Sequence, residues 1–504
     1  MIPVIVGVAD VKNRSTAVED AKEPAQLMLE AIRRAIQDAS RSQSTSDKLQ
    51  ASVDSIDVVR TWTWPYADLP ALLAEKLGVS TKHRHYSEHG GNQPAKLLDE
   101  AALRVAKGDS KAAVITGAEA LASLTSCFKN GAIPPPGWTE PSEPIEDVFS
   151  PTHRDLSKDI GGRHSVGAPI QVYPLYENGF RARRGQSIAQ NHEESSVLYG
   201  NFSQVAQNNP YAWNSGSKET ASSIGTVSKK NRMICFPYPL LMNAFNTVNL
   251  GAACIITSTE FAKQLQIPED KWIYPPGLGE TELLPQLGDL RVYRPMSQLE
   301  QSFSRRDRHL RLLFLLPDCP KARLLPLGPI NNKPTEAYNS PWGPYFLRGA
   351  GNNYSMHAIT EVTRQLRKGK GRNALILANG GVLSYQHAIS LSRAAPKKGG
   401  PYPDSSTLRS RAAEIYPTIA EEANGPAVLE TYTVEFKRDG KPKMAYIVGR
   451  LRSNGHRFLA NHGDENTLTR LVSGNEDPIG KSGVVSTTQD GPRNLFYLDN
   501  SSKL

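Results

Sequence analysis

The fold is decided by residues 89–116, HGGNQPAKLLDEAALRVAKGDSKAAVIT. A Gly-Gly pair leads into a stretch whose apolar residues recur at helical spacing. Pro94 falls in the first helical turn, where its missing N–H removes no hydrogen bond. Gly108 ends this helix, because glycine readily adopts the left-handed conformation of a helix C-terminus. The apolar stretch from Lys111 to Thr116 then predicts a buried strand.

A similar unit occurs in the second half of the chain. The loop Gly349-Ala350-Gly351-Asn352-Asn353 precedes a predicted helix over Tyr354–Arg367, and a predicted buried strand follows over Ala374–Ala378. A basic turn with glycine closes each helix, Lys107-Gly108 in the first unit and residues 368–371 in the second. The repetition predicts an α/β chain of two similar halves, with coincidence between two common βαβ units as the alternative.

Composition limits the class of protein. The chain has 504 residues, of which 39% are hydrophobic and 22% charged, so it can build large cores and is not wholly disordered. No apolar run approaches the ~20 residues of a membrane helix, and the first residues indicate a strand and not a signal peptide. Four scattered cysteines exclude a disulfide scaffold and a Cys-based zinc module. The net charge of +9 indicates a solvated basic surface or an anionic cofactor.

Changes in composition predict the organisation of the chain. A serine-rich stretch over residues 40–46 predicts a loop, and prolines after residue 130 interrupt the αβ rhythm. Near the end, alternating segments separated by Arg438-Asp439-Gly440 and Asn454-Gly455 predict β-hairpins, arranged as a small barrel or as a plain antiparallel sheet. The predicted parts are a first half (1–130 and 231–262), an insertion (131–230), a second half (263–395), a linker (396–423) and a β-rich C-terminal domain (424–500).

These motifs resemble the active-site helix and following strand of the thiolase superfamily, and most closely its thiolase-like (acetyl-CoA acetyltransferase-like) members with an additional C-terminal domain. The matching segments are residues 90–94, 108–109, 117–120, 231–234, 349–359, 379–384 and 430–434. The resemblance implies a thiolase fold of two similar βαβαβαββ halves in five layers (αβαβα), plus a small barrel-like β domain. It also implies an acyl-CoA site between the halves.

The same resemblance identifies catalytic groups that this sequence lacks. Ordinary thiolases have a nucleophilic Cys at the start of the first-half helix, where the helix dipole lowers its pKa, together with an acid/base Cys and an activating His. The matching positions here are Gly91, Ala378 and Ala350. Without a thiolate there, the covalent acyl-enzyme route is closed.

The remaining polar residues predict direct chemistry at a CoA thioester. His357 and His89 are the candidate general bases, with packed or capping roles as the alternative. Tyr354 is a candidate acid or hydrogen-bond donor, and Asn352 belongs to the same predicted catalytic set.

A second set of residues is predicted to bind the oxyanion or CoA. Free backbone N–H groups of Gly90, Gly91 and Asn92 at a helix N-terminus suit a thioester oxyanion or a phosphate, although the glycines could simply permit a tight turn. The other predicted members are Asn353, Asn379, Gly380, Gly381, Ser384 and Asn246.

Two further groups have weaker chemical support in the sequence. Alternation along a strand would place His83 and His85 on one face as a possible metal pair, but Glu88 is the one carboxylate nearby, so we expect no metal. Cys319 precedes a proline and is a buried small hydrophobe or a further participant in the site.

Together these features predict a transferase of lipid metabolism, an acyl-CoA-dependent acyltransferase or an enzyme that forms or cleaves C–C bonds. Its partners are acyl-CoA and a small-molecule acceptor. The alternatives are a non-catalytic acyl-CoA- or lipid-binding protein, and nucleic-acid binding by the β domain, which lacks interleaved aromatic and basic residues. We expect a monomer or a homodimer. Ser502-Lys503-Leu504 is the tripeptide read by the peroxisomal import receptor, so we expect a peroxisomal protein.

Overall fold

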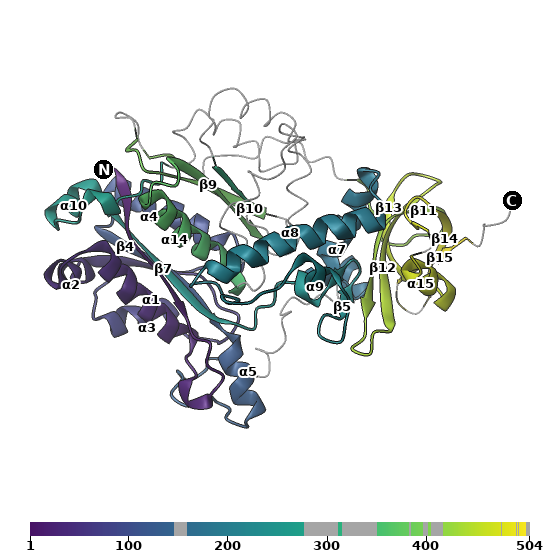
Figure 1. Ribbon diagram of the computed structural model, residues 1–504, viewed down its shortest axis with the longest axis horizontal. Coiled ribbons are helices and arrows are strands. Elements are labelled where there is room, and N and C mark those ends of the chain that lie inside the picture. The colour runs from purple at the N-terminus through teal and green to yellow at the C-terminus, as the bar shows by residue number, and fades with distance from the viewer. Residues whose placement is uncertain are drawn as a thin grey trace.

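The computed structural model contains three sheets of five, three and seven strands (Figure 1). The structure describes residues 1–145, 159–276, 311–314, 350–382, 385–396, 402–404, 417–474, 476–489, 491 and 493–499. Among the helices in these ranges, none has the length and hydropathy needed to cross a bilayer.

The five-stranded sheet has the order β1-β7-β4-β2-β3. Its strands are β1 (Pro3–Lys12), β2 (Val53–Val58), β3 (His83–Tyr86), β4 (Ala112–Ala120) and β7 (Asn249–Ser258). β2 runs parallel to β3 and β4, whereas β7 is antiparallel to β4 and β1. Every residue of β2, β4 and β7 is buried, as expected for a sheet covered on both faces. The carboxyl ends of β2 and β4 therefore meet at one edge of the sheet.

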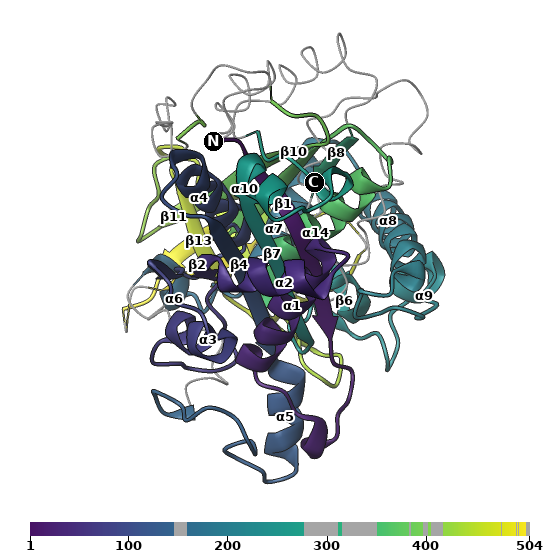
Figure 2. The same cartoon turned by 90° about the vertical axis from the view of Figure 1, so that its left-hand side faces the viewer.

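Helices cover both faces of this sheet (Figures 1 and 2). α1 (Pro24–Ala39) and α3 (Leu69–Leu77) pack on one face with one hydrophobic core, and α4 (Gln93–Lys107) and α14 (Tyr354–Arg367) form a second core on the other. The three-stranded sheet, with order β10-β9-β8, lies against α4 and α14. Its strands are β8 (Arg311–Phe314), β9 (Asn373–Gly380) and β10 (Tyr385–Ser392).

The paired units predicted from the sequence are confirmed. α4 and α14 have 15 and 14 residues, each is followed by a buried strand, and the two helices share one core. Gly108 ends α4 at φ 84°, in the left-handed region that favours glycine. Four of the five predicted layers are thus present in the described residues, and the prediction of a fifth falls outside them.

The predicted loop over residues 40–46 is wrong. Helix α2 (Gln43–Ala51) begins inside it, because the Ser42 hydroxyl accepts a hydrogen bond from the Thr45 N–H at 3.2 Å and caps the helix. The serines therefore mark a helix start. The other short elements are η1 (Val18–Asp20), α5 (Leu121–Lys129), η3 (Leu240–Met242), α10 (Thr259–Gln264) and η4 (Glu269–Lys271).

The C-terminal strands close into a five-stranded barrel, which confirms the barrel-like prediction. The strands are β11 (Gly425–Phe436), β12 (Pro442–Leu451), β13 (Arg457–His462), β14 (Ser482–Thr487) and β15 (Asn494–Leu498), with helix α15 (Glu465–Val472) between β13 and β14 in the sequence. They pair in the order β12-β13-β15-β14-β11, and β11 returns to β12. Two strands of the preceding chain, β5 (Met233–Cys235) and β6 (Tyr238–Pro239), extend this sheet from β11.

The predicted insertion is helical and packs on the barrel. Its helices are α6 (Ile160–Arg163), α7 (Pro169–Arg183), α8 (Ile188–Asn208) and α9 (Ala221–Gly225). Arg181 of α7 is 1% exposed and makes two hydrogen bonds with the carboxylate of Asp477, one of them 3.0 Å long from Nη2. Asn178 donates to the carbonyl oxygen of Tyr432 in β11 at 2.8 Å. A buried cation and a buried amide therefore join α7 to the barrel.

Replacing Asp477 with alanine tests the Arg181 contact. The variant leaves the guanidinium buried without its carboxylate, so we expect the free energy of unfolding in urea to fall by about 3 kcal/mol. The matched control is Glu476→Ala at the neighbouring position, whose carboxylate pairs with Lys481 and Arg470 on the surface and which should have a much smaller effect. Equal losses in the two variants would contradict the anchoring role.

Candidate active site

Three loops meet at the carboxyl ends of β2 and β4. They are Arg60–Thr63 after β2, His89–Asn92 before α4, and the 3-10 turn η7 (Gly351–Asn353) that opens α14. Ligand sites of open α/β sheets usually lie beyond the carboxyl ends of the strands. The sequence-predicted residues around Gly91 and Asn352 therefore come together at such a place, from opposite halves of the chain.

The side-chain amide of Asn352 links the three loops. Its Oδ1 accepts the Gly90 N–H at 3.0 Å, and its Nδ2 donates to the Arg60 carbonyl oxygen at 2.8 Å. These two backbone partners fix which end of the amide is oxygen, because one can only donate and the other can only accept. Nδ2 lies 2.9 Å from Nδ1 of His89, which is therefore the acceptor.

This hydrogen bond sets the chemistry of His89. With Nδ1 accepting, a neutral His89 carries its proton on Nε2 and acts as a hydrogen-bond donor there. Its half-buried ring stacks on Trp62 with the ring centroids 3.9 Å apart. The predicted role of His89 as a general base does not fit this tautomer, because Nδ1 accepts a hydrogen bond from Asn352 and Nε2 carries the proton.

Tyr354 occupies the place of a side chain at Gly91. A Cβ built on Gly91 would overlap the Tyr354 ring and lie 2.5 Å from the carbonyl oxygen of Asn379. The tyrosine hydroxyl accepts the Asn379 N–H at 2.6 Å and lies 3.2 Å from the Asn379 carbonyl oxygen. The position that matches the thiolase nucleophile is therefore closed to any side chain while Tyr354 holds this rotamer.

Two more side chains of the second half bond the backbone of the first. Ser355 Oγ donates to the Gly91 carbonyl oxygen at 2.7 Å, and Asn353 Nδ2 donates to the Gly117 carbonyl oxygen at 2.7 Å. A Cβ on Gly117 would lie 2.6 Å from Cγ of Asn353, so only glycine fits. Asn353 thus fixes the interface between the halves.

Glu119, at the end of β4, is a titratable group that was not among the catalytic or binding residues predicted from the sequence. Its carboxylate is 2% exposed and accepts hydrogen bonds from Trp62 N–H at 2.8 Å and from the Thr61 hydroxyl at 2.9 Å. Burial raises the pKa of Glu119 to about 7 despite these hydrogen bonds. A Cβ on Gly351 would lie 2.6 Å from Oε1, so the carboxyl group borders the turn that carries Asn352.

The sequence signal that could have identified Glu119 and its partners was their position along the chain. Thr61 and Trp62 follow β2, and Glu119 lies at the end of β4, three residues beyond the strand predicted over Lys111–Thr116. Parallel neighbours bring such residues to one edge, but the parallel pairing of β2 with β4 was not deduced from the sequence.

His357 lies elsewhere, in a buried ion-pair cluster between α14 and β1. Its Nδ1 is 2.5 Å from Oδ1 of Asp10, whose Oδ2 pairs with Arg364. Burial acts to raise the pKa of Asp10, but the charge of Arg364 and the hydrogen bond with His357 outweigh it and hold the pKa below its usual value. The structure therefore gives His357 a bonded position joining the halves and does not bring it to Gly90–Asn92.

The other predicted residues divide into several outcomes. The prediction that the N–H of Gly90 is free is wrong, because this N–H donates a hydrogen bond to Asn352. Oδ1 of Asn92 is buried and has no hydrogen-bond partner among the described residues. Gly380 ends β9, Gly381 follows in the left-handed region at φ 61°, and Asn246 has an exposed side chain. Ser384 and Cys319 lie outside the described residues.

The histidine pair on β3 has a partner already. Nε2 of His83 lies 3.2 Å from Oδ1 of Asp57, whose other oxygen pairs with Arg104. In the ranges that the structure describes, no three His, Cys, Asp or Glu side chains gather in a way that suits a metal ion.

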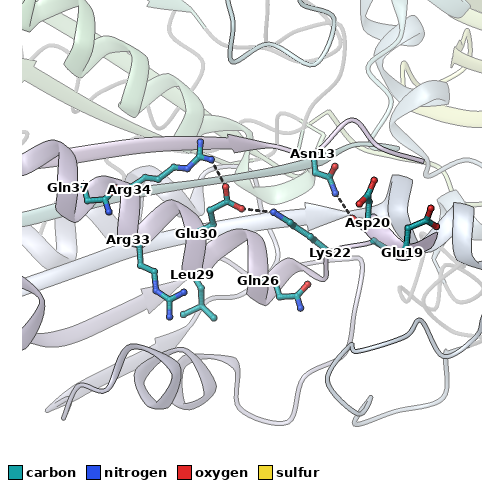
Figure 3. Close-up of a pocket in the computed structure, with 11 residues that line it drawn as sticks. Asn13, Glu19, Asp20, Lys22, Gln26, Leu29, Glu30, Arg33, Arg34 and Gln37 are labelled. Atoms are coloured by element: carbon teal, nitrogen blue, oxygen red, sulfur yellow. Dashed lines mark hydrogen bonds and ion pairs between the residues drawn. The ribbon is translucent and has the colours of Figure 1, made fainter. Parts of the chain in front are cut away.

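A separate groove of about 870 Å³ follows the exposed face of α1 (Figure 3). Glu30 pairs there with Lys22 at 2.9 Å and with Arg34 at 2.5 Å. No residue of the His89–Asn92 loop lines this groove, and three of its charged groups, Lys22, Glu30 and Arg34, are paired with one another. We assign it no role.

Comparison with known proteins supports assignment to a superfamily. Residues 410–491 match the family described as the thiolase-like protein type 1 additional C-terminal domain. The fold is similar to the crystal structure of a monomeric SCP2-thiolase like protein type 1 (STLP1) from Mycobacterium smegmatis, with 27% identity, a TM-score of 0.74, and 98% of this chain and 99% of that chain covered. The chain belongs to the thiolase superfamily.

Two looser similarities extend over 78% of this chain. They are to human mitochondrial 3-ketoacyl-CoA thiolase in complex with CoA (TM-score 0.49, 11% identity, 98% of that chain) and to an Ltp2-ChsH2(DUF35) aldolase (TM-score 0.48, 16% identity, 97% of that chain). No curated protein sequence matches significantly. The predicted thiolase fold with an added β domain is confirmed by the STLP1 similarity and the closed barrel, while the predicted domain limits stay predictions.

Placing a cysteine at Gly91 tests whether Tyr354 closes the nucleophile position. We expect Gly91→Cys to lower the free energy of unfolding by about 2 kcal/mol, because the new side chain collides with the tyrosine ring. It should form no acyl-enzyme with acetyl-CoA, measured as intact protein mass. The double variant Gly91→Cys/Tyr354→Ala removes the collision. Its loss in the free energy of unfolding should therefore be smaller than the sum of the losses of the two single variants. Simple additivity would show that the two residues do not compete for space.

The buried carboxyl group of Glu119 makes stability depend on pH. Its pKa is about 7 in the folded protein and ordinarily 4.5, so between these values the folded state holds a proton that the unfolded chain has released. The resulting stability is fully present below about pH 4.5 and is lost as pH rises to about 7. We expect wild type to lose about 3 kcal/mol relative to Glu119→Gln over this interval, measured by urea unfolding. Glu88→Gln, which changes an exposed carboxyl group nearby, should track wild type.

Proposed function

We propose that this chain is a CoA-thioester enzyme that works without a covalent acyl-enzyme. Either it transfers an acyl group directly to a small-molecule acceptor, or it forms or cleaves a C–C bond next to the thioester carbonyl. The observation that carries the proposal is at Gly91, the position that matches the thiolase nucleophile in the sequence resemblance. The Tyr354 ring fills the space that a Cβ of Gly91 would need, while the polar side chains of His89 and Asn92 lie in the same loop. The superfamily assignment supports CoA thioesters as the substrate class.

His89 supplies the hydrogen-bond donor in this proposal. Its Nε2–H, fixed by Asn352, would bond the thioester carbonyl oxygen and stabilise the negative charge that develops there. This replaces the role of general base expected for His89. Asn92, whose buried Oδ1 accepts no hydrogen bond in the described structure, offers an acceptor for an N–H group of the substrate.

Glu119 is the base in this proposal. A carboxyl group with a pKa of about 7 is partly ionised near neutral pH and can accept a proton there. In direct transfer, the acceptor hydroxyl or amine attacks the carbonyl carbon and its proton passes to the base. The C–S bond then breaks, and the CoA sulfur takes the proton from Glu119 and leaves as the thiol. The Thr61 hydroxyl donates a hydrogen bond to the Glu119 carboxylate at 2.9 Å and so links this base to the loop after β2.

Binding of acyl-CoA without turnover is the second candidate function. It is favoured by the hydrogen bond between Gly90 and Asn352, which removes one of the predicted oxyanion donors. It is favoured also by the bonded position of His357 beside Asp10. Under this alternative, the loops keep a thioester site but no catalytic group acts on it.

Replacing His89 with alanine separates the two functions. We expect wild-type protein to turn over an acyl-CoA in the presence of acceptors, and His89→Ala to lower kcat about 100-fold while the Kd for CoA from calorimetry stays within about twofold. His85→Ala, an exposed histidine on the neighbouring strand, is the matched control and should retain full activity. CoA binding by wild type without turnover of any acyl-CoA and acceptor tried would favour the binding function.

We also propose import into peroxisomes through Ser502-Lys503-Leu504. The tripeptide is the support for this proposal. A fluorescent protein carrying the last residues of the chain should colocalise with a peroxisomal marker, and removal of Leu504 should leave it diffuse. Diffuse fluorescence with the intact tripeptide would refute the proposal.

A further inference from the structure

Two basic turns leave the seven-stranded sheet at the same end. β11 and β5 are antiparallel, with Glu435 paired with Cys235 and the Phe236 N–H donating to the Val434 carbonyl oxygen at 2.9 Å. In an antiparallel pair, the chain that follows one strand lies beside the chain that precedes the other. The turn after β11 and the loop before β5 are therefore neighbours, and Figure 1 shows β5 next to the barrel strands.

These turns carry a concentration of positive charge, which we call the basic edge. Its cations are Lys229, Lys230, Arg232, Lys437, Arg438 and Lys441. All except the half-buried Arg232 are exposed. Within the described residues none of the six makes an ion pair, whereas the adjacent Lys443 is paired with Glu435 at 2.7 Å.

The basic edge is only weakly neutralised by its own segments. Asp439 is the one carboxylate in the turn after β11, and its Oδ1 accepts the backbone N–H of Lys441 at 3.0 Å. Six cations against this carboxylate leave an excess of five positive charges. Burial raises the pKa of the Cys235 thiol to about 12. The charge of Glu435 in β11 also raises this pKa, and the charge of Arg232 lowers it, as expected if the segment of Cys235 adjoins β11.

Backbone hydrogen bonds hold both turns in shape. Lys437 N–H donates to the Lys441 carbonyl oxygen at 2.8 Å. Ser228 and Asn231 exchange N–H to carbonyl bonds in both directions at 3.1 Å, which places Lys229 and Lys230 at the tip of their loop. The cations thus lie on ordered turns of the sheet, so a partner that binds them pays little conformational entropy for ordering the chain.

The surroundings favour a membrane over a nucleic acid. Sequence-tolerant binding of single strands relies on exposed aromatic rings for base stacking, but the barrel aromatics Tyr432, Tyr446 and Phe458 are at most 1% exposed. Beside the lysine pair stands Val227, an apolar side chain that is 52% exposed. Cations flanking an exposed apolar residue suit the interface of an anionic bilayer.

We propose that the basic edge docks this protein on membranes that carry anionic phospholipids. The proposal concerns a surface of the barrel and its neighbouring loop, and it is independent of the chemistry at His89. Docking would hold the chain next to the lipid phase in which long acyl chains reside.

Vesicle sedimentation with the full chain tests the proposal. We expect binding to phosphatidylcholine vesicles that contain phosphatidylserine, weakening with salt, and no binding to phosphatidylcholine alone. The variant Lys437→Glu/Arg438→Glu should lower the partition coefficient at least about tenfold. Its matched control is Lys368→Glu/Lys370→Glu, which makes the same charge change at exposed positions after α14 and should bind like wild type.

Several outcomes would overturn the proposal. Equal loss in the two double variants would mean that total charge, and not the basic edge, drives binding. Equal binding to neutral vesicles would exclude an electrostatic contact. Binding of an oligonucleotide at the same ionic strength without binding of anionic vesicles would assign the surface to nucleic acid.

Discussion

The hydrogen bonds of one amide, Asn352, hold the candidate site together. The side chain belongs to the second half, yet it forms hydrogen bonds with three residues of the first: Gly90, Arg60 and His89. Because two of these partners are backbone groups, the amide has only one orientation, and this orientation dictates where His89 carries its proton. A small change in the packing of the halves would therefore alter the acid–base character of the site as well as its shape.

The same interface explains why the thiolase cysteine has no room here. Tyr354 follows the Asn352 turn directly, and its ring rests on Gly91 while its hydroxyl bonds the backbone of Asn379. The glycine, the tyrosine and the bond to β9 form one arrangement that stabilises packing where an ordinary thiolase would place a reactive thiol. The Tyr354 ring thus takes the space that a side chain at Gly91 would need, and the polar groups of the candidate site are grouped around His89 and Glu119.

Local patterns allowed much of this fold to be predicted, and long-range contacts set the limit. Helical spacing and the terminal Gly108 gave α4 correctly, and turn residues gave the barrel hairpins, because both signals lie within a few neighbouring residues. His357 was expected at the site from its place after the Asn-rich loop. Its partner Asp10 is 347 residues away in the sequence, and no local pattern announces such a pair. Glu119 was overlooked for the same reason, since its role depends on the pairing of β2 with β4.

The short strand β5 has a consequence for how the barrel folds. It is supplied by chain that precedes the second half, yet it pairs with β11, which the ribosome delivers far later. During synthesis β5 can pair with β6 but must wait for β11, and a barrel excised at the linker would lose the strand that pairs with its longest strand. Core and barrel are expected to mature as one cooperative body, sealed by a strand that crosses the boundary between them.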